Sequence, residues 1–329
     1  MICGGCINLG DFPPNACGHS DICWRYIPDV DDWEIIGNLN EAAAAPAHDY
    51  SEAFGFAIAH HEGPSFEVTQ DGVNFELLAP YPNTDVMGVS GGTGDDGCLV
   101  VLDEKNVFLA GGRIDSDDPF VTEDFSPRAF LYNRDNDQWS EVESMPQGRK
   151  LHSCGVVDSF AGYQVIVAGT KEYPPDCLTC VEGPEEISVN VYDIRTNTWI
   201  NGEILGTKYY NKISKISSFI GTDLPYGVAG GATVRTEQSF AIVGGFSMEM
   251  DQDLDTILMY QPQDNTWMEL PGRLKTPRSG AMAIAIDPSI FPECPGYESS
   301  DATMQVSSGS ALLLIVFVIS IIPNFNKFI

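Results

Sequence analysis

Short apolar runs recur along the chain, and several of them end at glycine. Residues 107–110 (VFLA) lead into Gly111-Gly112, and residues 240–243 (FAIV) lead into Gly244-Gly245. A third run, residues 165–168 (VIVA), ends at Gly169. Short runs of apolar and β-branched residues bounded by turn formers predict buried strands. The glycines permit backbone conformations with positive φ where the chain leaves a crowded strand.

A second pattern follows these runs: a tyrosine and, seven positions later, a tryptophan. The residues between the two aromatics are turn formers rich in Asp, Asn and Pro, which predicts a β-hairpin. The same spacing in four places indicates an internal repeat. The four pairs are Tyr26 and Trp33, Tyr132 and Trp139, Tyr192 and Trp199, and Tyr260 and Trp267.

A weaker fifth copy lies at residues 66–75 (FEVTQDGVNF). Val68 and Phe75 take the aromatic places there, and Asp71-Gly72 supplies the turn. Runs of small and β-branched residues precede the glycine-ended strands and predict strands that crowd around an axis. These runs begin at Gly97, His152 and Gly227. Each unit is therefore expected to contain four antiparallel strands.

Together, the apolar run, the double glycine and the spaced Tyr and Trp resemble the Kelch repeat, over about residues 1 to 287. The resemblance implies an all-β fold, a β-propeller of four-stranded antiparallel blades. Five blades are recognisable, and a sixth is compatible with lost N-terminal sequence. We interpret the aromatics and the glycine pairs as structural, since large flat side chains bury well between neighbouring sheets. These positions are Tyr26, Trp33, Gly111, Gly112, Tyr132, Trp139, Tyr192, Trp199, Gly244, Gly245, Tyr260 and Trp267.

The two ends of the repeat region complement each other. The chain opens with Ile2-Cys3-Gly4-Gly5, which has the pattern of a second strand without its first. Residues 278–286 (RSGAMAIAI) have the pattern of a first strand with no successor. If the ring closes on itself, we expect the last strand to complete the first blade and give five blades.

Charge narrows the partner class. The 329 residues carry 17 Lys+Arg against 47 Asp+Glu, a formal charge of −30. We do not expect the protein to bind nucleic acid, because binding to the phosphates requires a basic protein surface. A basic protein partner remains compatible.

Acidic residues are concentrated in the loops that leave the Gly-Gly positions, which we expect to lie on one propeller face. We hypothesise that they dock a basic protein segment or hold calcium weakly, while a solvated surface that favours solubility is the alternative. No cofactor and no firm metal site is expected. The candidate binding residues are Asp115, Asp117, Asp118, Glu123, Asp124, Glu185, Glu186, Asp251, Asp253 and Asp255.

Catalysis is not expected. Some propellers of this repeat type resemble copper-radical oxidases, which need two His and two Tyr around copper. Only five histidines occur, and the adjacent His60 and His61 would point to opposite faces of a strand. We therefore predict a non-catalytic protein-interaction module that is associated with a membrane. An intracellular Kelch adaptor is the alternative, and a galactose-oxidase-like copper enzyme is a weaker one.

The C-terminal residues suggest how the protein reaches a membrane. Residues 1–290 are assigned to the propeller, 291–310 to a polar spacer and 311–329 to a hydrophobic tail. The tail fits a GPI-attachment signal or a transmembrane segment, so a cell-surface location is expected, with a cytoplasmic one as the alternative. The first residues lack the pattern of a secretory signal, for which an incomplete N-terminus is the favoured explanation. The nine cysteines are compatible with disulfides or with buried thiols.

Overall fold

The structure is a computed structural model. It describes residues 2–3, 6–8, 17–27, 30, 32–43, 46–60, 65–82, 96–114, 124–159, 162–170, 187–201, 223–236, 239–247, 249–262, 266–286 and 315–320. The regular structure of these residues is almost entirely β-strand. The all-β prediction is thereby confirmed.

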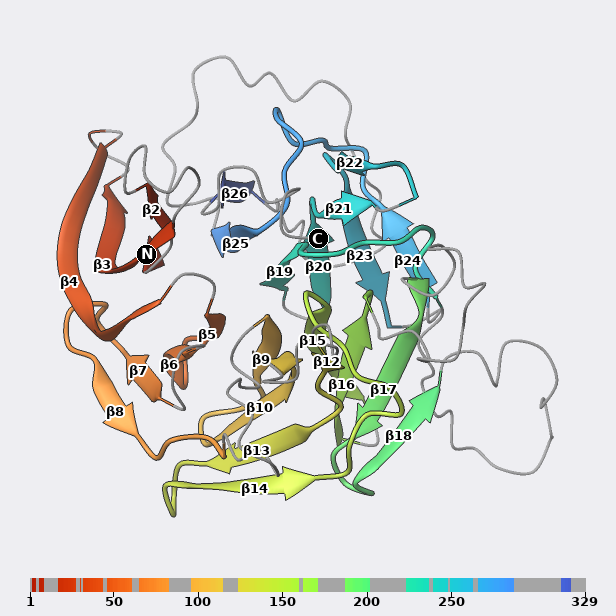
Figure 1. Cartoon of the computed structure of the whole chain (residues 1–329), viewed down its shortest axis with the longest axis horizontal. Coiled ribbons are helices and arrows are strands. Elements are labelled where there is room, and N and C mark those ends of the chain that lie inside the picture. Colours follow the sequence, from red (N-terminus) through yellow and green to blue (C-terminus); the bar gives the residue numbers. More distant parts are fainter. Residues whose placement is uncertain are drawn as a thin grey trace, which may run out of the picture.

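Four sheets of four antiparallel strands follow one another along the chain and surround a common centre as propeller blades (Figure 1). The second blade contains β5 (Ala47–Ser51), β6 (Gly55–Ala59), β7 (Phe66–Thr69) and β8 (Glu76–Leu78). The third contains β9 (Gly97–Val101), β10 (Asn106–Gly111), β13 (Ala129–Asn133) and β14 (Gln138–Val142). The fourth contains β15 (Ser153–Ser159), β16 (Gly162–Ala168), β17 (Val189–Asp193) and β18 (Thr198–Asn201). The fifth contains β19 (Ala232–Arg235), β20 (Phe240–Val243), β23 (Ile257–Gln261) and β24 (Thr266–Glu269).

An N-terminal sheet precedes these four blades. It consists of β1 (Ile2–Cys3), β2 (Cys6–Asn8), β3 (Cys17–Ile27) and β4 (Asp32–Ala43). Both β1 and β2 pair with β3, and their registers follow one another along it. β4 pairs with the other edge of β3 and carries the chain into the second blade. The N-terminal sheet therefore has the second, third and fourth strand positions of a blade, and a disulfide joins Cys3 to Cys23 across β1 and β3.

The last strands do not close the ring as the sequence predicted. β25 (Ala281–Ile286) pairs over its whole length with β26 (Ile315–Ser320), and not with β1. β26 belongs to the apolar tail, whose backbone groups satisfy the free edge of β25. The expected completion of the first blade by β25 is thus wrong in this structure, because a strand from the tail occupies that edge.

The tail residues that the structure describes form a strand. Nothing helical in the described part of the chain has the length and apolar character needed to cross a membrane. The expected membrane attachment through residues 311–329 remains a prediction.

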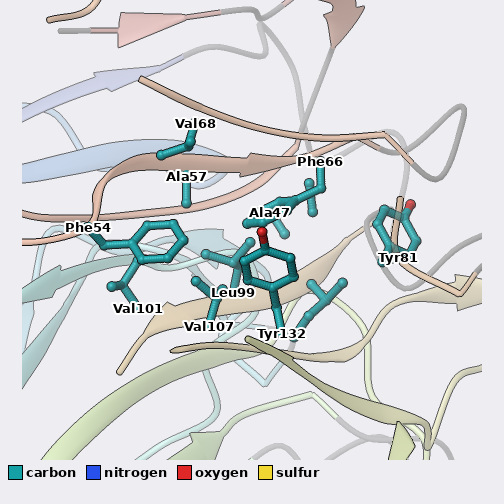
Figure 2. Packing of buried hydrophobic residues seen from close by; sticks show 12 residues of the cluster. Ala47, Phe54, Ala57, Phe66, Val68, Tyr81, Leu99, Val101, Val107 and Tyr132 are labelled. Carbon is teal, nitrogen blue, oxygen red and sulfur yellow. The ribbon is translucent and has the colours of Figure 1, made fainter. Parts of the chain in front are cut away.

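Apolar side chains fill the joints between neighbouring sheets. One cluster joins the second and third blades, a second joins the third and fourth, and a third joins the fourth and fifth. Figure 2 shows the first of these joints, where Phe54, Ala57 and Phe66 of the second blade meet Leu99, Val107 and Tyr132 of the third. Such burial of apolar surface is the main term that stabilises each joint.

The repeated aromatics pair as the sequence predicts. Tyr and Trp lie directly opposite each other in every hairpin: Tyr26 and Trp33, Tyr132 and Trp139, Tyr192 and Trp199, and Tyr260 and Trp267. In the weaker copy the hairpin is confirmed, with Gly72 at a φ of 74° in the turn. The partner of Val68, however, is Glu76 and not Phe75, so this copy has a different register.

The hairpin aromatics also bond to the preceding blade. In the third blade, Tyr132 Oη donates to Asp137 Oδ1 at 2.8 Å, and the same oxygen accepts the backbone N–H of Ala79. Trp139 Nε1 donates to the carbonyl of Ala79 at 2.8 Å. The third blade therefore bonds to both the N–H and the carbonyl of Ala79, the residue that follows β8 of the second blade. These bonds set the relative position of the two sheets.

The fourth blade repeats this arrangement one unit later. Asn197 Oδ1 accepts from Tyr192 Oη and from the backbone N–H of Glu143, and Trp199 Nε1 donates to the carbonyl of Glu143. Asp137 and Asn197 have φ values of 50° and 54°, in the left-handed region that Asp and Asn tolerate best among non-glycine residues. In the third and fourth blades the Tyr-to-Trp hairpin thus forms an interblade clamp as well.

Candidate functional site

The propeller has two distinct faces. β10 pairs with β13 from Ala110 opposite Ala129 to Asn106 opposite Asn133. The glycine face is the end with Gly111, Gly112, Gly244 and Gly245, and the turn face is the end with the Tyr-to-Trp turns. The loops expected to carry the binding residues leave from the glycine face.

Two of these loops begin as equivalent two-stranded ribbons. β11 (Arg113–Ile114) pairs with β12 (Asp124–Phe125) in the third blade. β21 (Phe246–Ser247) pairs with β22 (Gln252–Asp253) in the fifth. Each ribbon follows a Gly-Gly pair and returns to the third strand of its blade, so the prediction that these loops share one face is confirmed for both.

Only some of the predicted acidic residues belong to the described structure. Asp251 is exposed in the turn between β21 and β22 at a φ of 51°. Asp253 Oδ1 accepts a hydrogen bond from Ser279 Oγ at 2.7 Å, and Asp255 lies 3.9 Å from the guanidinium of Arg273. Asp124 lies in β12. Asp115, Asp117, Asp118, Glu123, Glu185 and Glu186 lie outside the described residues.

These acids do not converge on one point in the described structure. Asp253 and Asp255 each have a partner in the segment that follows β24, whereas Asp251 faces solvent. Across the described ranges, no three His, Cys, Asp or Glu side chains lie together in a way that could hold a metal ion. The predicted acids of the fifth-blade ribbon and the segment after it therefore have separate surroundings in the region described.

A different set of polar residues lines a cavity at the propeller centre. The cavity has a volume of about 120 Å³ and is lined by the first strands of four blades, β5, β9, β15 and β19. These strands are neighbours around the axis in the order β5, β9, β15, β19, and β25 follows β19. Their composition of small residues leaves the central space open, and polar groups enter it from three of the four strands or their flanks. The polar lining groups are His48, Asp49, His152, Thr233 and Arg235.

Asp49 and Arg235 bind the same residue from two sides. Asp49 Oδ2 accepts the backbone N–H of Val101 at 2.8 Å, and Arg235 Nη1 donates to the carbonyl of Val101 at 2.6 Å. The three residues belong to β5, β9 and β19, so this contact joins the second, third and fifth blades across the centre. No ion pair joins Asp49 to Arg235 among those of the described residues.

The cavity environment changes how Asp49 titrates. Burial raises the pKa of Asp49 to about 6, while its backbone hydrogen bonds and the charge of Arg235 act in the opposite direction. The Asp49 carboxylate is thus poorly solvated, and its few contacts do not offset the loss of hydration. Perturbed titration of this kind in a concave site is a feature of binding and catalytic centres.

Two histidines lie at the end of the cavity nearer the glycine face. His48 Nδ1 lies 2.9 Å from the carbonyl of Pro46, and burial lowers its pKa. Burial also lowers the pKa of His152 to about 3, and the positive charge of Arg149 adds to this effect. His152 is 6% exposed, and neither ring nitrogen has a hydrogen-bond partner. A neutral His48 donates its Nδ1–H to the Pro46 carbonyl, which leaves Nε2 as an acceptor, whereas a neutral His152 has one donor and one acceptor.

A disulfide crosses the cavity wall. Cys98 of β9 is bonded to Cys154 of β15, which ties the innermost strands of the third and fourth blades together. The sequence left these cysteines unassigned. Because the first strands of neighbouring blades do not hydrogen-bond to each other, this covalent link fixes a distance around the axis that the sheets leave free.

The sequence reasoning did not select any of these cavity residues. Asp49 and Arg235 went unnoticed, and His48 and His152 were considered only as copper ligands. A usable signal was present for two of them, because His152 begins and Arg235 directly follows a run of small and β-branched residues that was expected to be innermost. No innermost run was predicted at His48 and Asp49. Polar side chains in such a strand point either into the centre or into a joint, and only the register decides which.

His60, in contrast, belongs to a joint. His60 Nε2 lies 2.5 Å from Glu67 Oε1, and both side chains are buried. Glu67 Oε2 accepts two hydrogen bonds from Asn40 of β4, from the backbone N–H at 3.1 Å and from Nδ2 at 2.6 Å. These contacts connect the second blade to the N-terminal sheet, so His60 serves packing in this structure.

The fold places the chain among the β-propellers, as its strand pairing shows directly. Neither a protein-family model nor a curated protein sequence matches it. Among solved structures 186 chains match. The structure of YjhT is similar over 73% of this chain and 69% of that chain, with 14% identity and a TM-score of 0.49. At this level the likeness supports no inference about function, and the Kelch resemblance continues to rest on the repeated residues.

Proposed function

We propose that the protein is a non-catalytic interaction module of Kelch type, whose glycine face presents acidic loops to a basic segment of a partner protein. The observation that supports this most is the equivalence of the β11–β12 and β21–β22 ribbons. Two loops in the same structural position, both rich in acids, give one face a concentrated negative potential. Such a field attracts and orients a basic partner.

An oxidising location suits this role. The two disulfides, Cys3–Cys23 and Cys98–Cys154, favour the secretory pathway or the cell exterior, since cytosolic thiols are kept reduced. Attachment to a membrane through the C-terminal segment is part of the proposal. Mass spectrometry of protein from its native source, alkylated before and after reduction, tests the compartment: four free thiols at these positions would contradict it.

The docking face can be tested with charge variants on opposite faces. The test variant carries Asp115→Asn, Asp117→Asn and Asp251→Asn in the glycine-face loops. The matched control carries Glu52→Gln, Glu104→Gln and Asp135→Asn, three exposed acids on the turn face. Binding of a fluorescent ten-lysine peptide is measured by anisotropy at low and physiological ionic strength.

We expect the glycine-face variant to lose affinity and to show a shallower salt dependence, because fewer counterions are exchanged on binding. The turn-face variant should bind nearly as well as the native chain. Equal losses in both variants would mean that the peptide responds only to net charge, and the proposed docking face would then be wrong. Salt-independent binding would also contradict it, because exposed charges are screened over roughly 8 Å at physiological ionic strength.

A further inference from the structure

We propose that the central cavity binds a small zwitterion, a molecule that carries one carboxylate and one ammonium group, of which a free α-amino acid is the simplest kind. This site is distinct from the acidic loops of the glycine face. It is formed by the first strands of four blades and lies along the propeller axis.

The size of the cavity suits a ligand of a few heavy atoms. Its volume of about 120 Å³ is near that of engineered protein cavities, about 150 Å³, that bind benzene. The lining differs from such cavities, however, because Arg235, Asp49 and His152 are among its residues. A polar ligand is therefore favoured over an apolar one.

Arg235 provides the site for a carboxylate. Its guanidinium has five N–H donors, and within the described structure one nitrogen, Nη1, bonds to the carbonyl of Val101. The remaining donors match the planar geometry of a carboxylate, to which arginine binds through two parallel hydrogen bonds. The bond to Val101 holds the guanidinium in place before a ligand arrives.

Asp49 provides the site for an ammonium group. Oδ2 is bonded to the N–H of Val101, and the backbone N–H of Tyr50 also interacts with the carboxylate. The two oxygens of a carboxylate have about four acceptor positions, so capacity remains for a cationic donor. Asp49 and Arg235 bind the N–H and the carbonyl of the same residue, Val101, and no ion pair between the two is among those of the described residues. Opposite charges that are fixed near each other without pairing are satisfied together by a ligand with the complementary pair of charges.

One further observation favours a ligand that is neutral as a whole, and a second indicates that the cavity lacks a partner group. The chain carries a formal charge of −30, which repels a simple anion from a distance. A zwitterion is not repelled, and its two charges are neutralised locally at Arg235 and Asp49. His152, buried and without a hydrogen-bond partner at either ring nitrogen, also lines the cavity. A buried polar group that lacks partners indicates an absent ligand or water.

The test compares ligands of matched size on the full chain. Alanine carries both charges, propionate carries only the carboxylate and ethylamine only the ammonium group. Isothermal titration calorimetry with each compound should give a dissociation constant on the order of 1 mM for alanine, given how few heavy atoms contribute. Propionate and ethylamine should bind at least about tenfold more weakly, since each lacks one charge-assisted pair.

Variants then assign the charges. Arg235→Gln should abolish the advantage of alanine over ethylamine, and Asp49→Asn should abolish its advantage over propionate. Arg128→Gln, which removes a pair with Glu141 at the blade surface, should leave alanine binding unchanged. A loss of selectivity with retained weak binding cannot come from misfolding alone, which would remove all binding.

Three results would overturn the proposal. Equal affinity for alanine and propionate would make the site a plain anion site. No heat with any of the three compounds at high millimolar concentration would mean that the cavity holds only water. Undiminished selectivity for alanine in both Asp49→Asn and Arg235→Gln would place the ligand elsewhere. If neither variant folds, the selectivity of the native chain among the three compounds decides whether the proposal stands.

Discussion

Two carboxylates, Glu67 in a blade joint and Asp49 in the central cavity, show how differently this propeller treats buried charge. Glu67 has His60 on one oxygen and two donors of Asn40 on the other, and these contacts outweigh burial and lower its pKa. Asp49 has few such contacts, and burial raises its pKa to about 6. Glu67 is fully buried and Asp49 only partly, yet the contacts of Glu67 outweigh its burial and those of Asp49 do not.

Two arginines repeat this contrast. Arg149 is fully buried, and its guanidinium donates to Asn190, to both the hydroxyl and the carbonyl of Ser188, and to the carbonyl of Gly169. Arg235 donates to a single carbonyl. Arg149 at a joint thus has many internal partners, whereas Arg235 in the cavity keeps unused hydrogen-bonding capacity. Saturated polar groups specify structure, and unsaturated ones in a cavity are available to a ligand.

The largest expected effect comes from removing the saturated cation. Arg149→Leu should lower the free energy of unfolding by about 4 kcal/mol, because the buried acceptors at Asn190 and Ser188 lose their donor. Arg235→Leu should lower it by only about 1 kcal/mol, the value of one hydrogen bond. Urea unfolding followed by tryptophan fluorescence measures both. If the two variants lost the same free energy of unfolding, the proposed distinction between Arg149 at the joint and Arg235 in the cavity would be wrong.

A glycine at the joint should come next. Gly111 has a φ of 75°, and a Cβ there would clash with the His152 ring and lie 2.7 Å from the carbonyl oxygen of Arg149. Gly111→Ala should therefore cost about 3 kcal/mol, from backbone strain and displaced neighbours. Gly272→Ala is the control, since no atom lies within 4 Å of a Cβ built there. A stable Gly111→Ala variant would show that the joint is softer than its contacts indicate.

The two carboxylates should give opposite pH responses. The folded pKa of Asp49 is above its ordinary value of 3.8, so the native state binds the extra proton and the free energy of unfolding falls as pH rises from about 4 to about 6. Asp49→Asn should remove this fall, which we expect to be about 2 kcal/mol given partial solvent access. Urea unfolding at stepped pH provides the measurement.

For Glu67 the folded pKa is below its ordinary value of 4.5. Its stabilisation is therefore present above that pH and is lost as the pH falls through the folded pKa. The stability difference between the native chain and Glu67→Gln should accordingly narrow under acid conditions. A difference that stays constant across this range would mean that Glu67 acts as a neutral hydrogen-bonding group.

The smallest effect is expected at the interblade clamps. Asn197→Ala removes the acceptor for Tyr192 Oη and for the N–H of Glu143, and water can reach these partly exposed donors, so a loss of about 1 kcal/mol is expected. Asp137→Asn keeps both the acceptor and the tolerance of positive φ and should be nearly neutral. Thermal unfolding of both variants gives the comparison, and a large loss for Asp137→Asn would show that its charge matters.

The repeats were readable in the sequence because their chemistry is local. A Tyr and a Trp seven positions apart are brought opposite each other by a hairpin turn, whatever the rest of the chain does. The four complete blades, the innermost strands and the glycine-ended strands followed from this pattern. The clamp on the preceding blade was not predictable, because its partners lie more than fifty residues away, as in the bond from Trp139 to Ala79.

Ring closure shows the limit of the pattern. β25 has the composition of a first strand and was expected to pair with the start of the chain, yet it pairs with β26. Backbone hydrogen bonds between strands depend little on side-chain identity, so two apolar strands compete for one edge on equal terms. Repeat spacing contains no information on which of them wins.

The sequence by itself determined the blades, their order and the concentration of acids in loops after Gly-Gly, since each depends on residues near one another in the chain. Only the tertiary structure decided which polar side chains face the centre. Asp49 lies in β5, His152 directly precedes β15 and Arg235 lies in β19, and more than eighty residues separate each from the next. A shift of one residue in the register of a strand would turn its cavity side chains into a joint. The cavity therefore exists only where the separate strands meet around the axis.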